Sequence, residues 1–110
     1  MSKLSKAYAL IIGVGNDLPT TVLDATAIYN ILVNEELAGY PEENIILLTE
    51  DKATRQGILS GFDELILKID EDASVMLFYS GHGGFYEPWN QFYLVPNDFD
   101  ADDYDTTWIT

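Results

Sequence analysis

The stretch Ser74-Val-Met-Leu-Phe-Tyr-Ser80, followed at once by Gly81-His82-Gly83-Gly84, decides the fold. Its apolar run has the length and composition of a strand. The glycines predict a turn, and this turn carries the only histidine of the chain. Parallel α/β sheets gather their reactive groups at the carboxyl ends of the strands. The stretch therefore predicts both a strand of the sheet and a candidate site.

Two more apolar runs, over residues 8–14 and 44–49, predict buried strands of the same sheet. Thr21 and Asp24 have the form of a capping box for a helix that begins near residue 22, and Thr54 is placed to cap a second helix. Strands that alternate with helices predict an α/β fold with a parallel sheet and right-handed crossovers. The expected apolar stripes are Val22, Ala25, Ile28, Tyr29, Leu32 and Val33 in the first helix, and Ile58, Phe62, Leu65, Ile66 and Ile69 in the second.

Beyond Gly81 the pattern weakens. Residues 91–95 predict a short strand, which we pair in a small hairpin with Phe85-Tyr86. The last dozen residues are interpreted as an acidic loop. Trp89, Phe92 and Trp108 are interpreted as packing residues.

Composition limits the function. The 110 residues fit one small domain, and 47% of them are hydrophobic, too many for a disordered acidic tail. Without cysteine the chain has no disulfide, no thiolate metal site and no cysteine nucleophile. A net charge of −14 argues against nucleic acid and anionic membranes as partners and favours cationic ones. We find no membrane span or signal peptide, and we expect a cytoplasmic protein.

Two functions are open from the residues alone. Gly13-Val-Gly15 resembles the start of a dinucleotide-binding turn, but position 18 is Leu and Asp17 would repel a phosphate. His82, at the end of its strand, is either a general base or a histidine with a structural role.

The segment Phe78 to Gly84 resembles the histidine motif of the caspase–metacaspase superfamily of cysteine endopeptidases. Residues 8–15 resemble the family's first strand. Leu23-Asp24-Ala25 resembles the Asn-Asp-Ala at the start of its first helix, with Leu in place of Asn. Later elements agree in order: residues 46–49, Ala53-Thr54-Arg55, and Tyr93-Leu-Val-Pro96 with Asp98. The resemblance covers almost the whole chain.

The resemblance implies roles for single residues. His82 would form the thiolate of a cysteine and then protonate the leaving amine, and the N–H of Gly83 would be one oxyanion donor. Asp24 lines up with a pocket aspartate of the metacaspase branch, which cuts after Arg or Lys. Asp17 and Ser80 are further substrate-binding candidates. The alternatives are a helix cap for Asp24 and an Asx-type turn for Asp17.

The nucleophile is the missing part. In caspases the histidine precedes the cysteine by about 50 residues, which would place the cysteine near residues ~125–135. We therefore expect residues 1–110 to be the N-terminal, p20-like part of a caspase-like three-layer α/β sandwich, inactive without its C-terminal part. The third strand would then lack a neighbour, and its open edge would favour self-association or pairing with a complementary chain.

The acidic tail provides one candidate cation site. Some metacaspases bind calcium through aspartates near this region, and the corresponding residues here are Asp98, Asp100, Asp102 and Asp103. Their spacing departs from an EF-hand, and the alternative is a solvated acidic loop. No cofactor is needed for the chemistry itself.

The expected function is thus the catalytic-histidine half of a cysteine endopeptidase that cuts peptides after Arg or Lys. The alternative is a non-catalytic interaction or regulatory module with the same fold.

Overall fold

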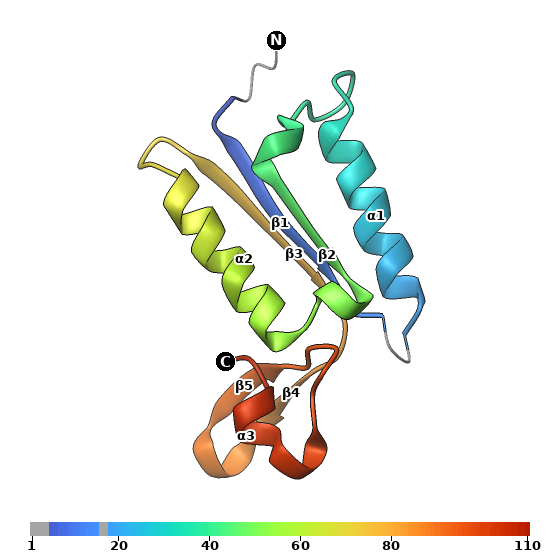
Figure 1. Cartoon of the computed structure of the whole chain (residues 1–110), viewed down its shortest axis with the longest axis vertical. Helices are drawn as coiled ribbons and strands as arrows, with labels where there is room; N and C mark the ends of the chain where they lie inside the picture. The colour runs from blue at the N-terminus through green and yellow to red at the C-terminus, as the bar shows by residue number, and fades with distance from the viewer. Residues whose placement is uncertain (1–4, 16–17) are drawn as a thin grey trace.

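The structure is a computed structural model that describes residues 5–15 and 18–110 (Figure 1). Three parallel strands, β1 (Ala7–Gly13), β2 (Ile45–Thr49) and β3 (Ser74–Ser80), form a sheet in the order β2-β1-β3. The two long helices, α1 (Thr20–Val33) and α2 (Arg55–Lys68), cover its opposite faces. The expected α/β fold with a mainly parallel sheet is confirmed.

The alternation of side chains along β1 builds the two cores. Leu10 and Ile12 point to the α2 face, whereas Ala9 and Ile11 point to the α1 face. All four are at most 3% exposed. A central parallel strand is covered on both faces, which is why its sequence is continuously apolar.

β3 is an edge strand, and two of its apolar side chains are exposed. Val75 and Leu77 are 43% and 57% exposed, although both are apolar. Both lie on the face that α2 covers, but α2 packs against β1 and β2 and leaves this part of β3 open. In the part of the chain that the structure describes, β3 pairs with β1 on one side and with no strand on the other.

The two helices begin in different ways. α1 begins at Thr20, and none of the described side chains caps it, so the predicted capping box of Thr21 and Asp24 is wrong. The hydroxyl of Thr21 instead accepts a hydrogen bond from the N–H of Gly15 at 2.6 Å. At α2 the prediction is confirmed, because the Thr54 hydroxyl accepts from the N–H of Gly57 at 3.0 Å.

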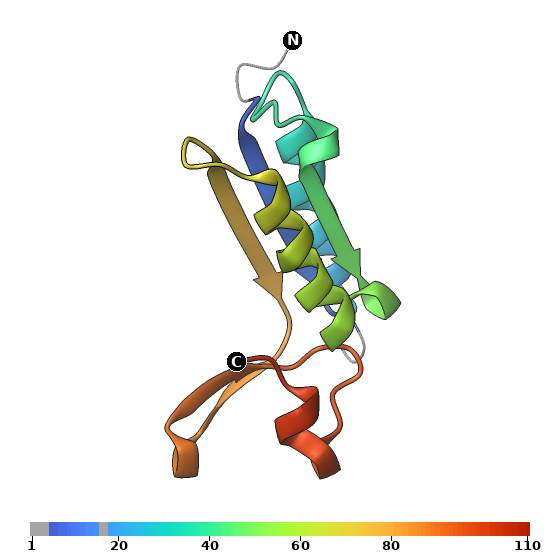
Figure 2. The same ribbon diagram turned by 60° about the vertical axis from the view of Figure 1, so that its left-hand side comes forward.

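A smaller lobe lies beyond the carboxyl ends of the strands (Figure 2). It contains the predicted hairpin, formed by β4 (Gly83–Tyr86) and β5 (Gln91–Leu94). The interpretation of the last dozen residues as a loop is wrong, because they contain α3 (Tyr104–Thr107) and a β-bridge between Ile109 and Leu94. Short 3₁₀ turns complete the chain at Glu42–Asn44, Glu50–Lys52, Glu87–Trp89 and Ala101–Asp103.

One residue of the expected apolar stripe lies at the surface: Ile66 is 63% exposed, so its assignment to the core is wrong. Trp89 and Phe92 are also exposed, at 54% and 73%, but both pack through their rings, Trp89 on Trp108 and Phe92 on Phe85. Trp108, at 6% exposure, is a packing residue as predicted. Among the helices in the described part of the chain, none has both the length and the apolar character that crossing a bilayer requires.

Candidate functional site

The carboxyl ends of β1 and β3 are joined beyond their last paired residues. Gly13 lies opposite Ser80, and the N–H of Val14 donates to the carbonyl oxygen of Ser80 at 3.0 Å. The chain then leaves β3 through Gly81, and His82 stands exposed between the sheet and the hairpin. The predicted position of the histidine at a strand end is what the structure shows.

The backbone of His82 is held from two sides. Its carbonyl oxygen accepts one hydrogen bond from the Tyr79 hydroxyl at 2.7 Å and another from the N–H of Val95 at 3.0 Å. The Tyr79 hydroxyl also lies 3.1 Å from the carbonyl oxygen of Val95. Burial raises the pKa of Tyr79 above its ordinary value, so the hydroxyl keeps its proton and remains a donor.

Position 81 has no room for a side chain, which explains the glycine there. A β-carbon at this position would lie 2.8 Å from the Tyr79 hydroxyl oxygen and 2.9 Å from Cγ2 of Val14. Real contacts of this kind are longer, so any larger residue would displace the group that binds His82.

The hairpin register sets the direction of the Gly83 N–H. Gly83 lies opposite Leu94, and both backbone groups of Leu94 bind Ile109 on the far side of β5. The two residues therefore form a non-hydrogen-bonded pair of the antiparallel ladder. In such a pair the N–H of each residue points away from the other strand, so the N–H of Gly83 points outward from the hairpin.

Asp24 and Ser80 lie at the same end and on the same face of the sheet. The first turns of α1 pack closely on Gly13, where a β-carbon would lie 2.8 Å from Cβ of Ala25. Asp24 is exposed in that segment of α1. Met76 and Phe78 pack on the α1 face, and Ser80 continues this alternation. Asp17 lies outside the described residues.

A pocket of about 350 Å³ lies between the ends of β1 and β2 and is lined by Gly15, Pro19, Val22, Glu50 and Asn97. The N–H of Gly15 is already bound to Thr21, so it is not available to a phosphate. Glu50, which has a left-handed backbone with φ of 50°, adds negative charge. Both observations count against the nucleotide-binding alternative at this turn.

The acidic tail uses its carboxylates within the fold. Asp98 accepts from the N–H of Arg55 at 2.8 Å, and Asp100 accepts from the N–H of Asp102 at 2.9 Å. In the described ranges, no three acidic or histidine side chains are grouped closely enough to hold a metal ion. Calcium binding by Asp98, Asp100, Asp102 and Asp103 stays a prediction, which a calorimetric titration with Ca²⁺ checks.

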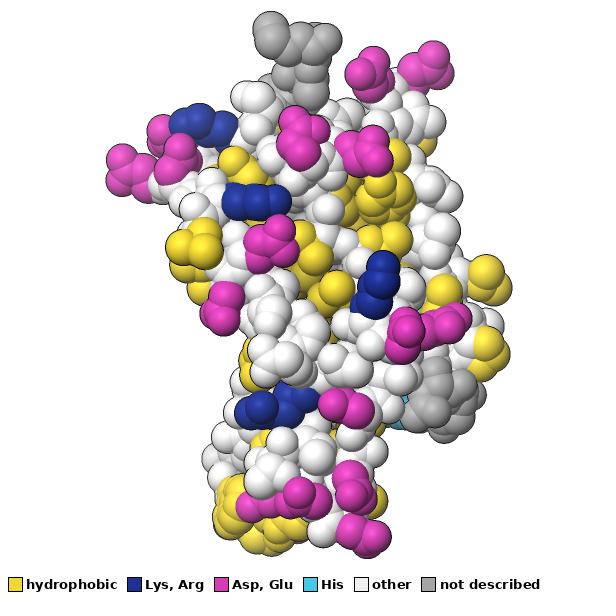
Figure 3. All heavy atoms as spheres, viewed as in Figure 1, with side chains coloured by type: hydrophobic (Ala, Val, Ile, Leu, Met, Phe, Trp, Pro, Cys, Tyr) yellow, Lys and Arg dark blue, Asp and Glu magenta, His cyan; other side chains and the backbone are white. Residues whose placement is uncertain are grey.

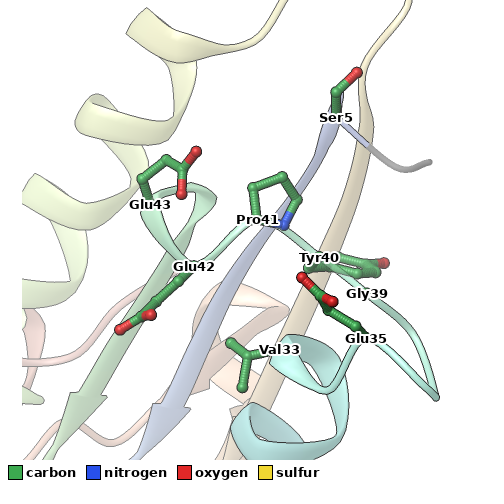
Figure 4. Close-up of a pocket in the computed structure, with 8 residues that line it drawn as sticks. All are labelled: Ser5, Val33, Glu35, Gly39, Tyr40, Pro41, Glu42 and Glu43. Atoms are coloured by element: carbon green, nitrogen blue, oxygen red, sulfur yellow. The ribbon is translucent and has the colours of Figure 1, made fainter. Parts of the chain in front are cut away.

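A hollow of about 460 Å³ lies at the opposite, amino end of the sheet (Figure 4). Its wall includes Val33, Tyr40 and the three carboxylates of Glu35, Glu42 and Glu43. Figure 4 shows Glu43 turned away from Glu35, so the carboxylates do not converge on one point. This hollow is therefore separate from the site at His82.

The sequence pattern did not reveal the role of Tyr79. Its position in an apolar strand predicts packing, and its hydroxyl contact depends on the return of the chain at Val95. Arg55 was also missed: its Nε donates to the carbonyl oxygen of Trp108 at 3.1 Å and connects α2 to the lobe. For Tyr79, the only signal in the sequence was its hydroxyl, because a buried tyrosine hydroxyl usually finds a hydrogen-bond partner.

Known proteins resemble this chain along most of its length. Residues 6–108 match the family model described as the caspase domain. Metacaspase-1 of Saccharomyces cerevisiae, in strains YJM789 and S288c, is 34% identical over 87 residues, which cover 69% of this chain and 20% of the relative. Metacaspase-1 of Eremothecium gossypii is 33% identical over 87 residues, covering 69% of this chain and 19% of the relative.

The chain thus spans about a fifth of the length of these curated relatives. No solved structure gives a significant match. The family match includes β1, both long helices, the His82 loop and the hairpin. The chain therefore belongs to the caspase–metacaspase superfamily.

Proposed function

We propose that this chain supplies the catalytic histidine of a cysteine endopeptidase whose nucleophile lies outside these 110 residues. The observation that carries the proposal is the double anchoring of the His82 carbonyl by Tyr79 and Val95. It fixes the backbone of an exposed imidazole directly before Gly83, whose N–H points outward. A base and an oxyanion donor side by side are what acyl transfer requires.

The chemistry follows from these two groups. The imidazole of His82 takes the proton of the cysteine thiol, and the thiolate sulfur attacks the carbonyl carbon of the peptide bond. Gly83 donates its N–H to the oxyanion of the tetrahedral intermediate. The imidazolium then protonates the leaving amine as the C–N bond breaks. Water, activated by the same imidazole, hydrolyses the thioester and restores the thiol.

We propose cleavage after Arg or Lys, with Asp24 as the carboxylate that receives the basic side chain. Asp24 is exposed at the active end of the sheet, and Ser80 lies on the same face. No Lys or Arg occurs between residues 69 and 110, which include the His82 loop, so this region favours a cationic substrate. A carboxylate contact to a substrate cation contributes about 1.5–3 kcal/mol.

The test uses the polypeptide in which this chain is continuous or paired with its cysteine-bearing partner. His82→Gln should lower kcat for an Arg-ending reporter by about 10²-fold or more. Asp24→Asn should lower kcat/KM for that reporter by about tenfold or more. The control Asp63→Asn makes the same charge change on an exposed part of α2 and should leave both values unchanged. Preferential turnover of an Asp-ending reporter would reject the specificity.

The second candidate is a non-catalytic interaction module with the same fold, which the open apolar edge of β3 favours. It predicts that the complete polypeptide hydrolyses no reporter and that His82→Gln changes nothing. Hydrolysis that depends on His82 rejects the module and supports the enzyme.

The partner of the β3 edge is part of the same proposal. We propose that the free edge of β3 pairs with a strand of a complementary segment or of a second copy. Exposed Val75 and Leu77 beside an unpaired backbone support strand addition.

A further inference from the structure

The lower lobe contains a pocket whose wall is almost entirely aromatic. Its volume is about 290 Å³, and it lies between the hairpin and the segment that ends in α3. Besides Ala101, its lining consists of five aromatic residues: Tyr86, Tyr93, Phe99, Tyr104 and Trp108.

The rings that line the pocket, which we call the cage, contact one another at several angles. Trp108 is the buried base, and Tyr93 stacks on it with 4.9 Å between the ring centroids. Tyr86 and Tyr104 meet Trp108 nearly edge-on, at 5.8 Å and 5.3 Å. Phe99 lies parallel to Tyr93 at 6.3 Å. The pocket is thus lined by one packed cluster of aromatic rings.

Two walls of the cage are fixed to each other. The hydroxyl of Tyr104 donates to that of Tyr86 at 2.9 Å. The side chain of Tyr93 lies directly over Gly84, where a larger residue would clash with it. A β-carbon at Gly84 would lie 2.5 Å from the Tyr93 hydroxyl oxygen. The cage is therefore built by hydrogen bonding and by a required glycine, as well as by apolar packing.

The charges around the pocket select the sign of its ligand. Four aspartates flank its lining residues Ala101 and Tyr104 in sequence, namely Asp100, Asp102, Asp103 and Asp105. Figure 3 shows several acidic side chains on the face of this lobe that is in view. Arg55 binds the Trp108 carbonyl but is not part of the lining. The negative faces of aromatic rings attract cations, and the aspartates strengthen the attraction.

We propose that this cage, defined by Tyr86, Tyr93, Phe99, Tyr104 and Trp108, binds the ammonium or guanidinium group of a basic side chain in a partner peptide. The site lies in the lobe and uses none of the residues assigned to hydrolysis. It therefore goes beyond the proposed function, and it stands whether or not His82 acts as a base.

The test titrates the chain with three small probes while tryptophan fluorescence is recorded. The probes are the acetylated amides of lysine, of arginine and of neutral norleucine. Trp108 lies in the cage and Trp89 lies 5.8 Å from it, so occupancy changes the emission directly. We expect a saturable change with at least one cationic probe, weakened by added salt, and no saturation with norleucine.

Two phenylalanine variants form a matched pair. Phe99→Leu keeps an apolar side chain in the cage but removes a ring, and it should weaken binding by about two- to fivefold. Phe92→Leu makes the same change at a residue that is 73% exposed and outside the cage lining, and it should leave binding unchanged. The chain with His82→Gln should bind like the wild type.

Three results would overturn the proposal. The first is equal saturation by norleucine and by the cationic probes. The second is the lack of a saturable response to any cationic probe at concentrations up to about 10 mM, tenfold above a Kd of about 1 mM. The third is equal weakening of binding by both leucine variants. The first would indicate a merely apolar pocket, and the last a nonspecific surface effect.

Discussion

The hydroxyl of Tyr79 donates to the carbonyl oxygen of His82 at 2.7 Å, three residues further along the chain. The variant Tyr79→Phe loses this hydrogen bond and keeps the one from the Val95 N–H to the same oxygen. We expect a loss of about 1 kcal/mol in the free energy of unfolding, measured by urea denaturation. Hydrogen exchange at the amide of Val95 should become faster.

The matched control is Tyr8→Phe, which removes a hydroxyl on the same face of the neighbouring strand. It should change the unfolding free energy by less than half as much as Tyr79→Phe. Equal losses in the two variants would show that the His82 contact contributes nothing specific.

Gly81→Ala should destabilise the chain because its β-carbon has no room beside Tyr79 and Val14. Overpacking of this kind costs about 1–3 kcal/mol. Gly83→Ala is the comparison, since the nearest atom to its β-carbon is 3.2 Å away and the position is exposed. Thermal unfolding of both variants checks the order, and a melting temperature for Gly83→Ala below that of Gly81→Ala would contradict it.

The ion pair between Lys6 and Asp70, at 3.0 Å, predicts a dependence of stability on pH. The hydrogen bond from Lys6 lowers the pKa of Asp70 below its ordinary value of 3.8. The ionised Asp70 carboxylate therefore stabilises the folded state above pH 3.8, and this stabilisation is lost as the pH falls through the lower, folded-state pKa. Asp70→Asn should flatten this part of the curve of melting temperature against pH.

Both partners of this pair are exposed, so salt should weaken it. The hydrogen bond to Asp70 raises the pKa of Lys6 above 10.5, and this contribution is lost only as the pH rises through that raised value. The fall of the melting temperature at low pH should therefore change in Asp70→Asn and in about 1 M salt, which screens exposed charges. If neither changes it, the Lys6–Asp70 pair is not its cause.

Leu77→Lys should reduce association through the β3 edge. The side chain is 57% exposed on the strand itself, where a lysine blocks the approach of another strand. Sedimentation velocity should show a larger monomer fraction than in the wild type. Leu67→Lys is the control, because Leu67 is 87% exposed but lies on α2. A wild type that sediments as a monomer at every concentration tested would contradict edge pairing.

The elements whose identity depends on local sequence were predictable. The apolar run of β1, the Thr54 cap and the hairpin around residues 85–92 all formed as expected. Family membership, inferred from the residues around His82, is confirmed by the match over residues 6–108.

The errors arose where a partner distant in sequence determines the outcome. The Thr21 hydroxyl binds the Gly15 N–H and is thus lost to the helix cap. Ile109 belongs to the segment that is interpreted as an acidic loop, yet it is buried because it packs on α2 and pairs with Leu94 of β5. The exposure of Leu77 likewise depends on which element covers β3, and the strand's own residues do not contain that information.

Leu94 and Ile109 exchange both of their backbone hydrogen bonds, at 2.7 Å and 3.0 Å. The intervening segment is therefore a loop closed at its base, and Arg55 holds it a second time through Trp108. A protease that cuts once among the exposed residues 100–103 would break the chain without releasing either part. The nicked protein should migrate as one species under native conditions and as two fragments only after denaturation.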